Sequence, residues 1–360
     1  MTNCDLVDTL WEVVDIVRIL QQNTRCIIMK MFTSFSVLIA SASLIADQHP
    51  EDLLQTELPA SLKIEANVAF TEGPAWHAPS SSVFFSDVPN NRIMRRDASG
   101  SLQIYRYPSM HANGLAFDQH NRLVACQGGL ADNVRGVTRS EPDGTITYLT
   151  DNFEGKRYNA PNDLAIDSQG RIYFTDPRYG PRDDMEILDE EGKPIEGVYR
   201  IDANRSVTRL LSHEIHRPNG IAISADEQFL FVADNASGRP NGNRKLWRFD
   251  LDDDGNTNPD SRLELFDWRS RLGIDRGPDG MALGKDGNLY VTAGWNFNDA
   301  PTSEPRIYKA GIYVIDPSGQ GLQRFIPIPQ DDITNCAFGG EDGNTLYITA
   351  GQRLFSVGIE

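Results

Sequence analysis

The chain has 360 residues and a formal net charge of −17 at neutral pH. Nucleic acids and anionic membrane surfaces attract basic proteins, so this charge argues against both as partners. The four cysteines, Cys4, Cys26, Cys126 and Cys336, show no spacing typical of a zinc site. Cys126 and Cys336 replace apolar residues within expected strands, which predicts buried free thiols.

The first sixty residues differ from the rest of the chain. An apolar stretch over residues 32–46 follows a lysine and ends in polar residues, and residues 40–42 (ASA) offer a small-residue cleavage site. This pattern is typical of a secretory signal peptide over residues 29–46 that starts at Met29 or Met31. The stretch is too short for a convincing membrane span. We therefore expect a secreted or periplasmic protein, or a cytoplasmic one if the segment is not used.

Two further segments flank this stretch. Residues 1–28 are interpreted as an upstream extension from a mis-assigned start codon. Their apolar residues recur at helical spacing, which leaves an amphipathic helix as the alternative. Residues 47–60 are expected to form a flexible lead-in to the main domain.

The dominant feature of the remaining chain is a phrase that occurs six times. The phrases begin at Glu72 (EGPAW), Asn113 (NGLAF), Asn162 (NDLAI), Asn219 (NGIAI), Asp279 (DGMAL) and Thr334 (TNCAF). Their first residues are 41 to 60 positions apart. Self-similarity at such a period indicates repeated supersecondary units.

Each phrase consists of two short apolar runs separated by a turn. In the third phrase the runs are residues 164–166 and 172–174, with the turn at 167–170. Short runs rich in β-branched and aromatic residues around such turns are typical of antiparallel hairpins. A second pair of predicted strands follows each of the first five phrases. Four strands per unit at this period are typical of a β-propeller, which predicts an all-β fold with six blades.

The sixth unit lacks one strand, because only residues 353–359 form a run after its hairpin. Residues 61–66 form a predicted strand ahead of the first phrase. We expect this N-terminal strand to join the last blade and close the ring, since closure removes exposed sheet edges. The propeller is thus expected to span residues 61–360 as one domain.

The first residue of every phrase carries a side-chain oxygen. The inner strand of each propeller blade lines the central channel, so we expect these residues to converge at one mouth of it. Glu72 and Asp279 would supply carboxylates, and Asn113, Asn162 and Asn219 would supply amides. All-oxygen ligands suit one hard divalent cation, Ca²⁺ first, with Mg²⁺, Mn²⁺ or Zn²⁺ as alternatives. Asn-Gly and Asp-Gly also occur in ordinary turns, but turn chemistry does not explain Glu before Gly-Pro.

The second strand of the hairpin ends at the same mouth and carries an aspartate there in three blades. These residues are Asp87, Asp176 and Asp234. They would either orient the amides and touch the substrate or cap turns, as aspartate often does. Capping is favoured for Asp87, and the two interpretations are balanced for the other two.

An ordered set of motifs resembles a known family from about residue 62 to the C-terminus. The motifs are EGPAW (72–76), PNDLAID (161–167), YFTDP (173–177), RPNGIAIS (217–224) and PDGMALGKDGNLYVT (278–292). Together they resemble the family of senescence marker protein, gluconolactonase and luciferin-regenerating enzyme, and its bacterial gluconolactonase branch in particular. The resemblance implies a divalent cation at the channel mouth, often calcium, and hydrolysis of sugar lactones.

Residue roles follow from the resemblance by position. It implies that Glu72, Asn162, Asn219 and Asp279 ligate the metal and that Asp279 is the catalytic acid/base. Asn113 has a weaker claim as a ligand and is assigned to the substrate or to an outer-sphere water.

The resemblance is weakest at the residues expected to contact the substrate. Some family members place an arginine two residues before the third-blade asparagine, where it contacts the sugar. This chain has Ala160 there, so Arg157 is the candidate replacement. Tyr179 and Trp295 follow second strands and are candidate pocket walls, and Asp176 is a further candidate substrate contact.

The leading hypothesis is a metal-dependent hydrolase that opens glucono-1,5-lactone or a similar aldonolactone to the aldonic acid. The metal would polarise the carbonyl, and Asp279 would move the proton. A phosphotriesterase of the diisopropyl-fluorophosphatase type, with the same metal ring, is the second hypothesis. The third is a non-catalytic binding propeller of the NHL or WD type, which would not need an acidic ring. The sequence leaves the oligomeric state open.

Overall fold

The computed structural model describes residues 53–54, 57–129, 135–237, 239, 241–296 and 309–359. The predicted extension over 1–28, the predicted signal peptide over 29–46 and most of the lead-in lie outside the described residues. Within the described residues, no helix is long and apolar enough to cross a membrane.

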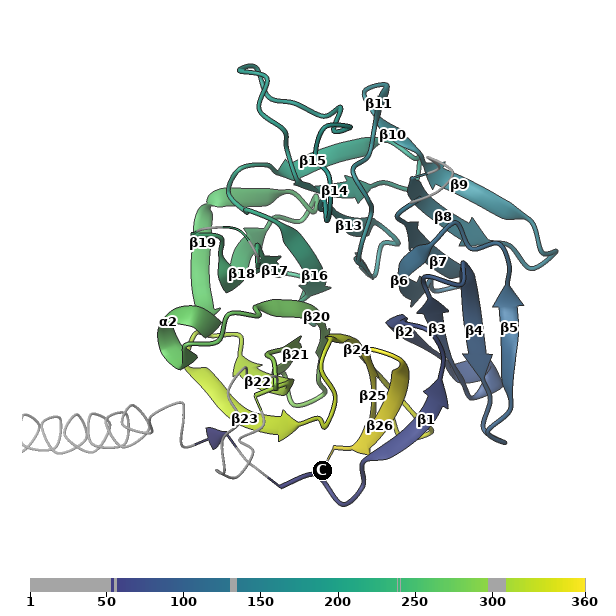
Figure 1. The fold of residues 1–360 in the computed structure, drawn as a ribbon. Coiled ribbons are helices and arrows are strands. Elements are labelled where there is room, and N and C mark those ends of the chain that lie inside the picture. The colour runs from purple at the N-terminus through teal and green to yellow at the C-terminus, as the bar shows by residue number, and fades with distance from the viewer. Residues whose placement is uncertain are drawn as a thin grey trace, which may run out of the picture. The chain divides into compact units, whose positions relative to one another are not determined.

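The strands after the lead-in form six antiparallel sheets of four strands each, arranged around a common centre (Figure 1). This confirms the predicted all-β propeller with six blades. From the inner strand outward, the first three blades are β2 (Thr71–His77), β3 (Ser82–Asp87), β4 (Arg92–Arg96) and β5 (Leu102–Arg106); β6 (Ala112–Phe117), β7 (Leu123–Gln127), β8 (Gly136–Ser140) and β9 (Ile146–Thr150); and β12 (Leu164–Ile166), β13 (Ile172–Asp176), β14 (Gly197–Ile201) and β15 (Val207–Leu211).

The remaining blades have the same order of strands. They are β16 (Pro218–Ile223), β17 (Phe229–Asn235), β18 (Arg244–Leu251) and β19 (Thr257–Asp267); β20 (Pro278–Leu283), β21 (Leu289–Ala293), β22 (Gly311–Asp316) and β23 (Gly321–Pro327); and β24 (Ile333–Gly339), β25 (Thr345–Ala350), β26 (Arg353–Gly358) and β1 (Lys63–Asn67).

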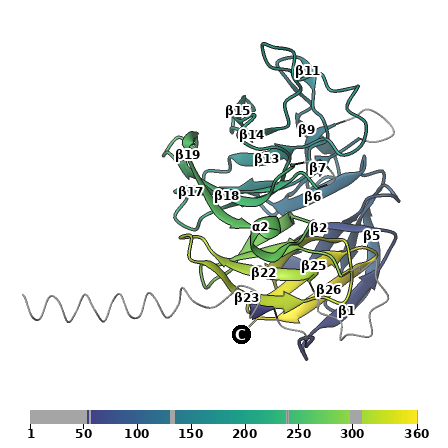
Figure 2. The same cartoon turned by 60° about the vertical axis from the view of Figure 1, so that its left-hand side comes forward.

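The N-terminal strand closes the ring as predicted. β1 pairs antiparallel with β26, with Lys63 opposite Ser356, and both views show the two strands side by side (Figures 1 and 2). Closure pairs the outer edge of β26, an edge that would otherwise be free to associate with other chains.

Three elements lie outside the repeat. A 3₁₀ turn (η2, Ala78–Ser80) follows the first inner strand, and a short hairpin, β10 (Asn152–Phe153) with β11 (Lys156–Arg157), precedes the third. The helix α2 (Trp268–Leu272) follows β19, and its N-cap Asp267 accepts hydrogen bonds from the backbone N–H groups of Arg269 and Ser270.

The core lies between neighbouring sheets. One cluster joins Phe231 and Leu246 of the fourth blade to Val291 and Tyr313 of the fifth, and all four are fully buried. Another contains Cys126, which is a buried free thiol, as is Cys336. Each blade therefore buries its faces against its neighbours, and apolar burial between blades stabilises the ring.

Glycine at the second position of four phrases lets neighbouring inner strands approach closely. A Cβ atom at Gly73 would lie 2.2 Å from the Asn113 carbonyl oxygen, and one at Gly220 would lie 2.3 Å from the Asp279 carbonyl oxygen. Any side chain there would push two blades apart at the channel. The glycine of the Asn-Gly and Asp-Gly pairs is therefore required by packing between blades.

Hydroxyl groups of the second strands tie the blades together at the same level. Each donates a hydrogen bond to the carbonyl of the first phrase residue in the next blade: Ser86 to Asn113 (2.7 Å), Thr175 to Asn219 (2.7 Å) and Thr292 to Thr334 (3.0 Å). Thr334 itself donates to the Thr71 carbonyl and so links the last blade to the first. These bonds fix the positions from which the ring residues project.

We predict that Gly220→Ala lowers the free energy of unfolding by about 3 kcal/mol, because the new methyl group would overlap the backbone of the next blade. The measurement is urea unfolding followed by circular dichroism. Gly128→Ala is the matched control, since its Cβ would meet no atom closer than 3.7 Å. The close-approach argument fails if the two variants unfold at the same urea concentration.

Candidate functional site at the channel mouth

In five of the six phrases the first residue lies where the inner strand is bulged, whereas Asn162 precedes the regular strand β12. The pairing register shifts between Glu72 and Ala75 in β2, between Pro218 and Ile221 in β16, and between Pro278 and Met281 in β20. A bulge re-aims the side chains at that point of a strand and is frequent beside active sites. Glu72, Asn219 and Asp279 lie at or within these bulges.

The two carboxylates of the predicted ring are buried near each other. Burial raises the pKa of Glu72 well above its usual range, and the negative charges of Asp279 and Asp163 raise it further. Burial also raises the pKa of Asp279 to about 6, against the opposing effects of the Arg276 guanidinium and of a hydrogen bond with Asn219. Ionising both carboxylates without a compensating cation is therefore unfavourable.

The three asparagine side chains of the predicted ring differ in their hydrogen bonds. Asn113 hydrogen-bonds the Glu72 carboxylate. The Asn219 amide Nδ2 donates to the Tyr179 hydroxyl (2.7 Å), which leaves its oxygen as the group available for a ligand. The Asn162 side chain has no hydrogen-bond partner among the described residues, although it is only 8% exposed. The oxygens of Asn162 and Asn219 are thus free to coordinate a cation.

This donor set fits a hard divalent cation. Two carboxylates with raised pKa values would be relieved of their repulsion by such an ion, and amide oxygens suit Ca²⁺. The described residues contain no cluster of three or more His, Cys, Asp or Glu side chains of the kind that holds a metal. A cation here would therefore rest on the mixed set of Glu72, Asn162, Asn219 and Asp279, half of which are amides. The assignment of these four residues as ligands stays a prediction.

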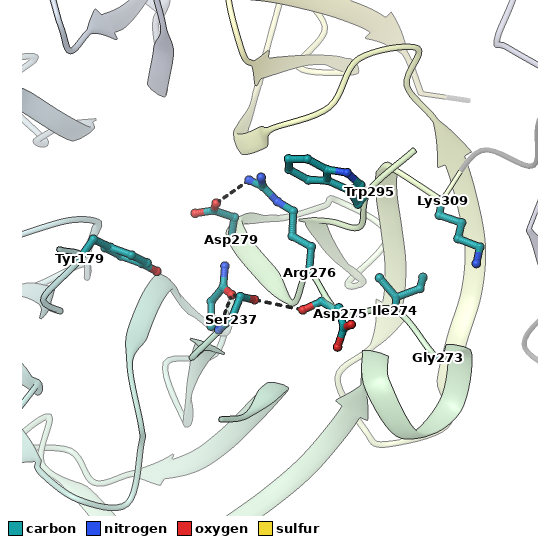
Figure 3. Close-up of a pocket in the computed structure, with 10 residues that line it drawn as sticks. Tyr179, Ser237, Gly273, Ile274, Asp275, Arg276, Asp279, Trp295 and Lys309 are labelled. Carbon is teal, nitrogen blue, oxygen red and sulfur yellow. Dashed lines mark hydrogen bonds and ion pairs between the residues drawn. The ribbon is translucent and has the colours of Figure 1, made fainter. Parts of the chain in front are cut away.

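A pocket of ≈ 630 Å³ opens at Asp279 (Figure 3). Its lining includes Tyr179 and Trp295, the two residues predicted as pocket walls. Arg276 also lines the pocket, and its Nη2 lies 3.1 Å from Asp279 Oδ2 while its Nη1 pairs with Asp332. The pocket thus brings the predicted acid/base together with two aromatic rings and a guanidinium.

The structure assigns the strand-end aspartates to turn capping. Asp176 is fully buried and accepts hydrogen bonds from the backbone N–H groups of Asn159 and Ala160, three and two residues before Asn162. Asp87 and Asp234 bind the backbone at the equivalent two positions before Glu72 and Asn219. The Asp176 carboxylate holds the loop that presents Asn162, and the structure gives no support to a contact between Asp176 and the substrate, which stays a prediction.

Arg157 is not brought to the pocket. It lies in β11, where its guanidinium donates to the Asp184 carbonyl (3.1 Å) and pairs with Glu186 (3.3 Å). It is not among the lining residues of the pocket at Asp279. The structure gives no support to Arg157 as the replacement for the family's sugar-binding arginine.

The sequence interpretation missed a polar pair inside the channel. Asn335 Nδ2 donates to Asp163 Oδ2 (3.1 Å), so the third and sixth blades, which face each other, are joined across the centre. The second phrase position is glycine in the other four blades, and this exception was a readable signal. Burial raises the pKa of Asp163 to about 7.

The fold and this site define a six-bladed propeller in which buried oxygen-bearing side chains lie beside a pocket at the channel mouth. The model of the "SMP-30/Gluconolactonase/LRE-like region" family matches residues 70–352, and the chain belongs to this family. The expectation from the sequence motifs is thereby confirmed.

Named relatives agree with this membership. The chain is 30% identical over 312 residues to a gluconolactonase of Zymomonas mobilis, covering 82% of this chain and 80% of that protein. The solved structure of a gluconolactonase of Xanthomonas campestris matches with a TM-score of 0.66 and 27% identity, covering 83% of this chain and 89% of that one. A calcium-binding regucalcin of Agrobacterium tumefaciens shares the fold, with a TM-score of 0.63 and 18% identity over 85% of this chain and 96% of that one. These relatives support lactone hydrolysis as the general reaction.

We predict that Asp163→Asn makes the metal-free protein more stable than the wild type at about pH 8. An unfolded aspartate has a pKa near 3.9, whereas that of Asp163 is about 7 in the folded state. The folded protein therefore holds the proton more tightly, and the wild-type side chain costs stability as pH rises between these values, by up to about 4 kcal/mol. Asparagine does not ionise.

Urea unfolding of both proteins at about pH 5 and about pH 8 measures this difference. The advantage of the variant should grow with pH. Asp97→Asn serves as the control: hydrogen bonds from Ser99 lower the pKa of this exposed carboxyl, so it is ionised in both the folded and the unfolded protein at both pH values, and its effect on stability should not change between them. A constant difference between wild type and Asp163→Asn would contradict the assignment.

Proposed function

We propose that this protein is a divalent-cation-dependent lactonase that opens an aldonolactone, such as glucono-1,5-lactone, to the aldonic acid. The observation that carries the proposal is the position of Asp279, which belongs both to the ring of buried oxygen ligands and to the lining of the pocket. The gluconolactonase relatives support the choice of substrate, and the calcium-binding regucalcin supports Ca²⁺ as the first cation to test.

Glu72, Asn162, Asn219 and Asp279 would hold the cation. When bound, a divalent cation supplies a Lewis acid that polarises the lactone carbonyl. Glu72 and Asp279 contribute the two negative charges that balance such an ion. Asn113, through its hydrogen bond with Glu72, fixes the orientation of that carboxylate.

Asp279 is the proton carrier of the proposed reaction. As a carboxylate it accepts a proton from the water that attacks the carbonyl carbon, and it returns the proton to the ring oxygen as the carbon–oxygen bond breaks. Arg276 contacts one carboxylate oxygen and fixes the orientation of Asp279. A carboxylate is a modest base, which is sufficient for a lactone because its ester is already reactive.

The substrate would lie between the aromatic walls. Tyr179 and Trp295 are 40% and 38% exposed, so both rings present apolar surface to the pocket. The carbon-bound hydrogens of a sugar ring pack well on such faces, while its hydroxyl groups can reach Asn235 and Ser237, which also line the pocket.

We predict that gluconolactone hydrolysis by the purified protein disappears in EDTA and returns with Ca²⁺, Mg²⁺, Mn²⁺ or Zn²⁺. Asp279→Asn should lower kcat/KM at least about 100-fold, because it removes the proton carrier. Glu72→Gln should weaken Ca²⁺ affinity, measured by calorimetry, at least about tenfold, because it removes one of two ligand charges. The readout is base consumption at constant pH, after subtraction of spontaneous hydrolysis.

Asp97→Asn, an exposed change in the first blade, is the control and should leave activity and affinity unchanged. Circular dichroism establishes that each variant is folded. Lactone turnover that ignores EDTA, in protein shown to be free of metal, would overturn the proposed dependence on a cation. Hydrolysis of diisopropyl fluorophosphate without lactonase activity would favour the phosphotriesterase hypothesis, and neither activity with no bound cation would favour a binding propeller.

A further inference from the structure

Both aromatic walls of the pocket are backed by an arginine. The Arg217 guanidinium lies 4.7 Å from the centre of the Tyr179 ring, and the Arg276 guanidinium lies 5.6 Å from the centre of the Trp295 ring. Stacking of this kind holds a cation close to an exposed aromatic face. Each apolar wall therefore has a guanidinium group behind it, and each of these groups is ion-paired: Arg217 with Glu196, and Arg276 with Asp279 and Asp332.

On the side of Tyr179, positive charge exceeds negative charge. The buried Glu196 carboxylate is shared by three guanidinium groups, those of Arg182, Arg217 and Arg239. One carboxylate neutralises one of these three charges. Because Glu196 is only 3% exposed, the remaining charge is carried by side chains nearer the solvent, with Arg182 36% and Arg239 29% exposed.

On the side of Trp295, Lys309 supplies a further charge. It lines the pocket, and its ammonium has no acidic partner among the described residues. Asp275, the other acidic residue in the lining besides Asp279, pairs with Arg269 (3.0 Å). Figure 3 shows Lys309 apart from Asp279, with Trp295 and Ile274 between them.

The local positive charge beside the pocket contrasts with the net negative charge of the whole chain. The whole protein carries −17. The charged residues that line the pocket are balanced, with Arg276 and Lys309 against Asp275 and Asp279, and the excess of cations lies in the cluster behind Tyr179, where three guanidinium groups share one carboxylate. A divalent ion would neutralise Glu72 and Asp279, so the ring would not cancel that excess. A positive cleft in an acidic protein concentrates anionic ligands.

We propose, resting on the lactonase function above, that the preferred substrate is a lactone with an oxyanion group at the end remote from its carbonyl. Lys309 contacts this carboxylate, phosphate or sulfonate while the carbonyl lies at Asp279. Arg217 and Arg276 hold the aromatic walls and contribute to the field, and Lys309 determines specificity.

The test compares kcat/KM for the neutral gluconolactone with those for 6-phosphogluconolactone and glucarolactone, in wild type, Lys309→Met and Lys309→Arg. We expect the wild type to favour at least one anionic lactone by about tenfold or more, the gain of one charge-assisted contact. Lys309→Met should raise KM for that lactone by a similar factor and leave KM for the neutral lactone unchanged. Lys309→Arg should keep KM for the anionic lactone close to the wild-type value. Added salt should raise KM for the anionic lactone only.

The two anionic lactones distinguish a phosphate from a carboxylate as the recognised group. Equal or better turnover of the neutral lactone by the wild type overturns the inference and leaves the lactonase proposal standing, as does an equal effect of Lys309→Met on all three substrates. If the protein hydrolyses none of the three lactones, both proposals are overturned.

Discussion

Close packing of the inner strands around the channel is the constraint on which the candidate site depends. Glycines at the second phrase position let each backbone approach its neighbour, and hydroxyl groups such as those of Ser86 and Thr175 tie that backbone to the next blade. The adjacent first position can then project only toward the mouth of the channel. A small buried volume thus receives oxygen-bearing side chains from five blades, which no single hairpin could assemble.

The same packing buries carboxyl groups at the site and makes their ionisation unfavourable. Glu72, Asp163 and Asp279 are each less than 10% exposed, and burial is the largest cause of the raised pKa of all three. The Arg276 guanidinium opposes the rise in pKa at Asp279. Because the desolvated carboxylates cannot be relieved by solvent, a divalent cation is the ligand that changes their energetics most. Packing alone would be served better by apolar residues, so the acidic ring supports the proposed cation site.

Much of this was predictable from the sequence, because it follows the repeat. The period of the repeated phrase predicts the blades and the closing strand. The first position of the phrase predicts which residues converge at the channel mouth. The Asp163–Asn335 pair follows the same logic, since third and sixth blades are opposite. Non-repeating features were not predictable: Arg157 is engaged in a hairpin outside the repeat, and Lys309 lies in the connection between β21 and β22, a connection whose length differs from blade to blade.

Asp163 and Asn335 join the third and sixth blades across the channel. Both line a second cavity of ≈ 190 Å³ inside the channel, whose other walls include Leu115, Ile221 and Met281. The other pocket, between Tyr179 and Trp295, opens at Asp279. Its lining includes Ser237, Asp275 and Lys309, which lie in connections between strands, whereas Glu72, Asn219 and Asp279 lie in inner strands. Under the proposed function, the connections would therefore determine selectivity while the inner strands would supply the chemistry.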